Sequence, residues 1–122
     1  MKDFRDLKVW QKAHQLTLAI YRVTAAFPSS ELYGLTSQMR RSSASVPANI
    51  AEGACRDGDA EFCRFLHIAM GSASEVDYFL LLACDLGFLR REESEGLMRD
   101  AAEVKRMLSA LINKLKADRA ES

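Results

Sequence analysis

The sequence lacks the features that mark several classes of protein. It has no apolar run of 18 residues, which a membrane-spanning helix would need, and it begins with mixed charges instead of an apolar signal segment. Its 17 Lys and Arg residues are matched by 17 Asp and Glu residues, so no net charge attracts a polyanion from a distance. We therefore expect a cytoplasmic protein outside the membrane, with any nucleic-acid contact confined to a local patch.

Cysteine is scarce, and its spacing fits neither a disulfide framework nor a zinc site. Cys55, Cys63 and Cys84 form no CxxC pair, which indicates free thiols in a reducing compartment. Cys63 and His67 lie four residues apart, with Met70 next, and could begin a soft metal site. A packed thiol beside a partly exposed histidine explains the same spacing. We expect no metal and no cofactor.

Catalytic motifs are also missing. His14 and His67 fall on different predicted helices, and neither lies near a nucleophile elbow or a phosphate-binding loop. We expect that the protein is not an enzyme.

The positive signal is a heptad rhythm, in which apolar residues recur with alternating spacings of four and three. It predicts a first helix over residues 7–27 and three more helices behind it. The four seams are Val9, Ala13, Leu16, Ile20, Val23 and Phe27; Leu35, Met39, Ser42, Val46 and Ile50; Phe62, Leu66, Ala69, Ala73, Val76, Leu80 and Ala83; and Leu97, Ala101, Val104, Leu108, Leu111 and Leu115.

Proline and glycine mark the breaks. Pro28 stops the first helix, and Pro47 should kink the second because it lacks an N–H and crowds the carbonyl of Ser43. Gly53 and Gly58 bracket the end of the second helix.

Polar residues and a further glycine set the limits of the later helices. Asp57 or Asp59 can cap the third helix, and Gly87 suits the position after its C-terminus. An acidic run over residues 92–95 suits the start of the fourth.

Four helices joined by short links favour an all-α, antiparallel, up-down-up-down four-helix bundle, with the second helix kinked near Pro47. We expect residues 1–122 to form a single domain, with a core over about 5–116 and a frayed tail over 117–122.

Two helices carry a second apolar row beside the seam. A thick core with wide stripes would explain these rows, and so would contact between subunits. On the third helix the row is Phe65, Ile68, Ser72, Glu75, Phe79, Leu82 and Leu86, and on the first it is Trp10, His14, Thr17, Tyr21 and Thr24.

Glu75 is the unusual member of these rows, because a buried carboxylate without partners costs several kcal/mol. We predict that Arg40, Arg41 or Asn49 lies within hydrogen-bonding reach of it. A ligand or acid–base site is one interpretation, and a buried network that fixes helix register is the other. The candidate network consists of Asn49, Glu52, Ser72 and Glu75.

Basic residues gather near one face of the first helix. They are either the solvated face of an amphipathic helix or a phosphate-binding stripe, which ring symmetry would enlarge. The candidate nucleic-acid contacts are Arg5, Lys8, Lys12, Arg22, Arg40 and Arg41.

Four sequence blocks resemble a known family. They are Phe4-x-x-Leu7-x-Val9-Trp10-Gln11-Lys12-Ala13; Phe27-Pro28-x-x-Glu31-x-Tyr33-Gly34-Leu35-Thr36-x-Gln38-x-Arg40-Arg41; Ser45-x-Pro47-x-Asn49-Ile50-Ala51-Glu52-Gly53; and Phe65-Leu66-x-x-Ala69-x-Gly71-Ser72-x-x-Glu75. Together they resemble the four-helix-bundle proteins encoded in intervening sequences of bacterial 23S ribosomal RNA genes. More distantly, they resemble the accessory variability protein of diversity-generating retroelements.

This resemblance implies a four-helix bundle that assembles as a ring-like homopentamer. It also implies a connection with RNA or a ribonucleoprotein, and no established enzymatic activity. Three hypotheses remain: an oligomeric module that works with RNA or a ribonucleoprotein, a protein–protein scaffold without nucleic acid, and an unrecognised enzyme. The first is the one we favour.

Overall fold

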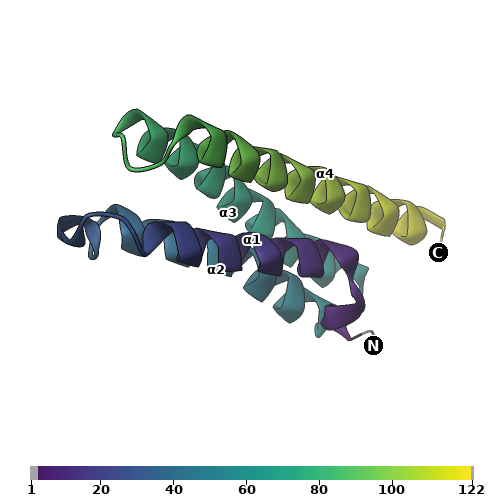
Figure 1. Cartoon of the computed structure of the whole chain (residues 1–122). Coiled ribbons are helices and arrows are strands. Elements are labelled where there is room, and N and C mark those ends of the chain that lie inside the picture. The colour runs from purple at the N-terminus through teal and green to yellow at the C-terminus, as the bar shows by residue number, and fades with distance from the viewer. Residues whose placement is uncertain (1–2, 122) are drawn as a thin grey trace.

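The computed structural model describes residues 3–121, and within this range every regular element is helical. The helices lie side by side, and both ends of the chain lie at the same end of the bundle (Figure 1). No helix in the described range is long and apolar enough to cross a membrane. The elements are the 3₁₀ turns η1 (Phe4–Asp6) and η2 (Ser29–Glu31) and the helices α1 (Lys8–Thr24), α2 (Leu35–Ala54), α3 (Asp59–Asp85) and α4 (Arg91–Glu121).

Polar contacts place α1 and α2 antiparallel. The Thr17 hydroxyl lies 2.9 Å from the Ser43 carbonyl oxygen, and Arg40 Nε donates to the Thr24 hydroxyl at 2.9 Å. Residue numbers therefore rise along α1 as they fall along α2.

The α2–α3 pair is also antiparallel, and it is close. The hydroxyl oxygens of Ser45 and Ser72 lie 2.9 Å apart. Farther along, a Cβ atom added to Gly53 would come within 2.7 Å of the Phe65 Cβ. Only a residue without a side chain fits this approach, which explains the glycine in the Asn-Ile-Ala-Glu-Gly block.

Contacts between α3 and α4 show that this pair is antiparallel as well. The buried Ser94 hydroxyl donates to the Leu80 carbonyl at 3.0 Å, and Cys63 Sγ lies 4.0 Å from the Ile112 carbonyl. With the other two pairs, this confirms the predicted up-down-up-down order.

The predicted seams form the core. All seam residues are buried except Val23, Phe62 and Leu111, which are half-buried. Where the sequence pattern placed Leu111 in the seam, the structure instead buries the next residue, Ile112, which is 4% exposed. The buried spacing from Leu108 to Leu115 is therefore four and then three.

Helix α2 continues through Pro47 because its neighbour supplies the missing donor. Proline has no N–H, so the carbonyl four residues earlier, that of Ser43, loses its helical partner. The Thr17 hydroxyl of α1 points at that oxygen, and both Thr17 and Ser43 are buried. The hydroxyl also lies 3.0 Å from the Ala13 carbonyl, which belongs to the α1 ladder. The kink at Pro47 stays a prediction.

Three helix limits differ from the sequence prediction. Helix α1 ends at Thr24 instead of Phe27, although Phe27 is still buried and its ring lies 5.6 Å from that of Phe88. Gly58, and neither Asp57 nor Asp59, occupies the N-cap of α3.

The third difference lies at the C-terminus, where α4 continues to Glu121, and fraying of residues 117–122 stays a prediction. The sequence after Lys116 contains no glycine or proline to stop the helix. Ser122 lies outside the described residues. Gly87 behaves as predicted, because it follows α3 with φ of 81° and the Phe88 N–H bonds back to the Ala83 carbonyl at 2.9 Å.

Candidate functional site

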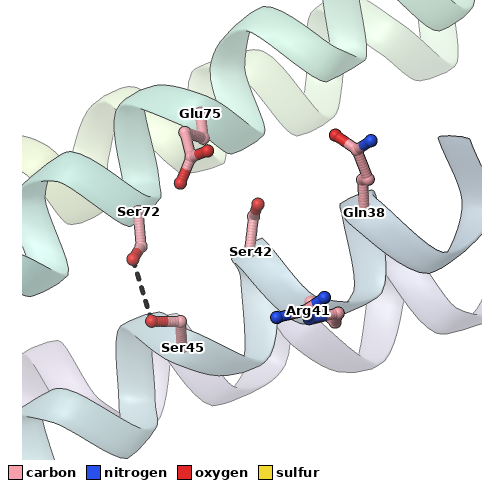
Figure 2. A pocket seen from close by; sticks show the side chains of 6 residues that line it. All are labelled: Gln38, Arg41, Ser42, Ser45, Ser72 and Glu75. Carbon is pink, nitrogen blue, oxygen red and sulfur yellow. Dashed lines mark hydrogen bonds between the residues drawn. The ribbon is translucent and has the colours of Figure 1, made fainter.

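A polar pocket opens between α2 and α3, and we call it the α2–α3 pocket. It has a volume of about 370 Å³, and Figure 2 shows that its walls come from both helices. Five of its residues belong to the sequence blocks described above, and Ser42 is the exception. The lining residues are Gln38, Arg41, Ser42, Ser45, Ser72 and Glu75.

The floor of this pocket holds a short chain of hydrogen bonds. Asn49 Nδ2 donates to the Ser45 carbonyl at 2.8 Å and to the Ser45 hydroxyl oxygen at 3.0 Å. Since Ser45 Oγ accepts that bond, its own proton is available for Ser72 Oγ at 2.9 Å (Figure 2). The chain fixes the register of α2 against α3, as predicted for Asn49 and Ser72.

Glu75 does not join this network, and the prediction of its partners is wrong. Its side chain is exposed, and it makes no hydrogen bond or ion pair with any described residue. Glu52 is likewise apart, because it pairs with Arg56 at 2.8 Å on the exposed side of α2. The second row of α3 turns toward the surface at Glu75, so the carboxylate keeps its water.

Three of the six candidate nucleic-acid contacts are engaged within the protein. Arg5 pairs with Asp3 at 3.2 Å, and Lys12 of α1 pairs with Glu103 of α4 at 3.5 Å. Arg40 is bonded to Thr24 and its guanidinium lies 4.7 Å from the centre of the Tyr21 ring, so it holds α1 against α2.

The other three basic residues are exposed and scattered. Lys8 and Arg22 lie on α1 and Arg41 lines the α2–α3 pocket, and none of them forms an ion pair with the described side chains. The structure therefore does not gather the six residues into one unpaired basic face.

Acidic residues of α4 border the C-terminal half of α1. A surface hollow joins Val23 of α1 to Glu92, Glu93 and Asp100 of α4, with Arg99 as the only cation among the described residues that line it. These carboxylates reduce the attraction of the α1 stripe for phosphate.

The outward side of α3 carries several large apolar side chains among exposed polar ones such as His67 and Asp85. Ile68, Tyr78 and Leu81 on this helix are 43%, 57% and 46% exposed, and Leu86 at its C-cap is 52% exposed. We call these four residues the outer α3 face. Ile68 and Leu86 belong to the second row, whereas Tyr78 and Leu81 were missed because they fit neither row.

The thiols and histidines do not converge on a metal site. Cys63 is buried, whereas Cys55 and His67 are exposed. No group of three His, Cys, Asp or Glu residues that could hold a metal ion occurs within residues 3–121.

Two side chains with shifted pKa values, Glu61 and Arg64, lie on the first turns of α3, away from the α2–α3 pocket. Arg64 Nε donates to Glu61 Oε1 at 2.9 Å, which lowers the pKa of the Glu61 carboxyl and raises that of the Arg64 guanidinium. Both side chains are about half exposed.

With this geometry in view, the sequence can be placed among known proteins. A model of the family described as 23S rRNA-intervening sequence protein matches residues 5–110. The chain belongs to this family. The resemblance inferred from the sequence blocks is therefore confirmed.

Solved structures agree with the 23S rRNA-intervening sequence family assignment. One is a protein of unknown function from the S23 ribosomal protein family of Bacteroides thetaiotaomicron VPI-5482, with 27% sequence identity and a TM-score of 0.77. The match covers 85% of this chain and 97% of that chain. No curated protein matches the sequence. Neither the family nor this structure indicates an enzyme family.

Proposed function

We propose that this protein is a non-enzymatic, homo-oligomeric helical module, cytoplasmic, that associates with RNA or a ribonucleoprotein. The observation that supports self-association is the outer α3 face. A cluster of large apolar side chains left exposed on one helix, here beside polar ones, is typical of a surface that another protein covers.

A second copy of the chain is the occupant that fits this face. The formal net charge is zero, so copies do not repel one another at long range. The neighbouring α2–α3 pocket presents Arg41 and Glu75, which have opposite charges and can be matched by the same two groups of another copy. A Cβ added to Gly71 would meet nothing within 4 Å, which leaves room for close approach.

The number of copies and the RNA connection come from the family. The resemblance implies a ring of five, and the family description refers to 23S rRNA intervening sequences. Five copies around one axis would repeat every local cation patch, which raises the effective affinity of weak phosphate contacts.

The second candidate function is a protein–protein scaffold without nucleic acid. It is favoured by the loop before α2, where Tyr33 is 94% exposed and Leu32 is 47% exposed. Hydrogen bonds from the Gly34 and Leu35 N–H groups to Glu31 hold this loop in one shape. An exposed tyrosine on a backbone held in this way is a good anchor for a protein partner.

Light scattering after size exclusion, at micromolar concentration, tests the self-association. Leu81→Glu on the outer α3 face should lower the mass, whereas Leu18→Glu on α1 should leave it unchanged. The two leucines form a matched pair, because they are 46% and 38% exposed. A monomeric wild-type protein would refute the proposal, and a dimer or tetramer would refute only the number five.

A further inference from the structure

Charge is distributed unevenly along α4. From Arg91 to Glu103 the sequence has five acidic residues and two basic ones, and from Val104 to Glu121 it has five basic residues and two acidic ones. The basic residues of this second half are Lys105, Arg106, Lys114, Lys116 and Arg119. A neutral chain thus carries a local positive region, which its total charge conceals.

A surface hollow lies beside this basic half. It has a volume of about 550 Å³, and its polar lining consists of Lys105, Arg106, Ser109 and Asn113, opposite Met70 of α3. An ammonium, a guanidinium, a hydroxyl and an amide can all donate hydrogen bonds. No carboxylate of the described residues lines the hollow.

Three of these donors, Lys105, Ser109 and Asn113, follow one face of the helix together with Lys116. Positions 105, 109, 113 and 116 are separated by four, four and three, so they lie in a row. From Lys105 to Lys116 the row spans about 17 Å, at 1.5 Å per residue. That length meets several successive phosphates of a nucleic-acid strand.

Two cations of this half of α4 are unpaired among the described residues, one within the row and one beside it. Arg106 and Lys116 are exposed and form no ion pair with the described side chains. Lys105 lies 3.9 Å from the Asp77 carboxylate of α3, a long and partly exposed contact that contributes little. Lys12 of α1 lies closer to its carboxylate, 3.5 Å from Glu103, in a pair that is also partly exposed.

We infer that the C-terminal half of α4, and not the α1 stripe, is the surface at which this protein contacts the phosphate backbone of RNA. The inference rests on the RNA association proposed above. Ser and Asn between cations are common phosphate contacts. A protein partner is less suited, because the hollow has alanines and one methionine but no aromatic anchor.

Fluorescence anisotropy with a labelled single-stranded RNA at low salt tests this surface. The Arg106→Glu/Lys116→Glu variant should lose on the order of tenfold or more in affinity. The control is Lys8→Glu/Arg22→Glu, which changes the net charge equally on α1 and should bind within about twofold of wild type. Circular dichroism should show both variants as helical as the wild type, since all four side chains are exposed.

Salt provides a second readout. Each lost phosphate contact should lower the slope of log affinity against log salt by about 0.7 for a single strand. The milder Arg106→Gln/Lys116→Gln variant, which introduces no repulsion, should show the same change in slope.

The outcomes separate this inference from the proposal beneath it. If the wild type binds RNA and the α4 variant binds equally well, or if the α1 variant alone loses binding, the inference is overturned and RNA association stands. If the wild type binds no RNA, both are overturned. Displacement of RNA by inorganic phosphate at constant ionic strength would overturn it in favour of a small-anion site.

Discussion

Helices α3 and α4 pack on each other, yet their outward sides carry different kinds of side chain. The outward side of α3 carries Tyr78 and Leu81, whereas that of α4 carries charges, acidic in its first half and basic in its second. Both helices have inner seams that are buried apart from the half-buried Phe62 and Leu111. The difference therefore does not concern the monomer's core, and it indicates two different neighbours: another protein surface for α3, and solvent or a polyanion for α4.

The largest effects on the free energy of unfolding should come from substitutions on the buried inner sides, where the two helices are alike. Leu80 of α3 and Leu108 of α4 are both 0% exposed. Each change to alanine should cost about 3 kcal/mol of unfolding free energy, because it removes buried surface and leaves a cavity. Urea denaturation measures both. A cost below about 1 kcal/mol for either would show that the inner sides are not equivalent.

Two glycines, Gly53 of α2 and Gly71 of α3, can separate the side of α3 that packs on α2 from its outer side. Gly53→Ala should destabilise by about 2 kcal/mol, although alanine favours helix, because its Cβ would collide with Phe65. Gly71→Ala is the control: its Cβ would meet nothing within 4 Å of the described atoms, so the monomer should gain up to about 1 kcal/mol. Equal effects of the two substitutions, measured by thermal denaturation, would contradict the assignment of sides.

The contact between α1 and α2 gives a reference for these stability changes, because it involves neither α3 nor α4. Thr17→Val should cost about 1–3 kcal/mol, since it leaves the Ser43 carbonyl without a donor, whereas Thr17→Ser should cost less. In a Pro47→Ala background the residue at 47 regains its N–H, and the penalty of Thr17→Val should shrink. A double-mutant cycle measures this coupling, and additive effects would show that Thr17 does not compensate for Pro47.

The smallest effect should be electrostatic and confined to α3. The Arg64 hydrogen bond lowers the pKa of Glu61, so the stabilisation is present above the unfolded pKa, near 4.5, and is lost as the pH falls through the lower folded value. Arg64→Ala should therefore be slightly less stable than wild type at neutral pH and match it in acid. Arg106→Ala on α4 should show no such convergence. Thermal midpoints against pH check both, and a wider gap in acid would contradict the assigned sign.

The fold could be predicted from the sequence because heptad spacing depends only on which residues are apolar. That rule identifies the inward seam, and it succeeded for residues as different as Met39 and Ala73. It does not fix how far each helix rotates against its neighbours. Glu75 was placed in a buried row for this reason, whereas the packing of α2 and α3 leaves it exposed.

The site was predictable only in part. Ser72 was found as a polar interruption of an apolar row, and Asn49 as a candidate partner of Glu75. Thr17 was overlooked as a donor, because its partner is a carbonyl freed by a proline 30 positions later in the chain. The charge division of α4 is visible in the sequence, but the charge balance of the whole chain averages it away.

The central claim is that the outer α3 face is buried between copies, and hydroxyl-radical footprinting read by mass spectrometry tests it most directly. Tyr78 on α3 and Tyr21 on α1 are 57% and 45% exposed in a single chain, so an isolated chain would oxidise at both. In the assembled protein Tyr78 should react several-fold more slowly than Tyr21, and Leu81→Glu should restore its reactivity. Oxidation of Tyr78 at least as fast as that of Tyr21 in the wild type would contradict the claim.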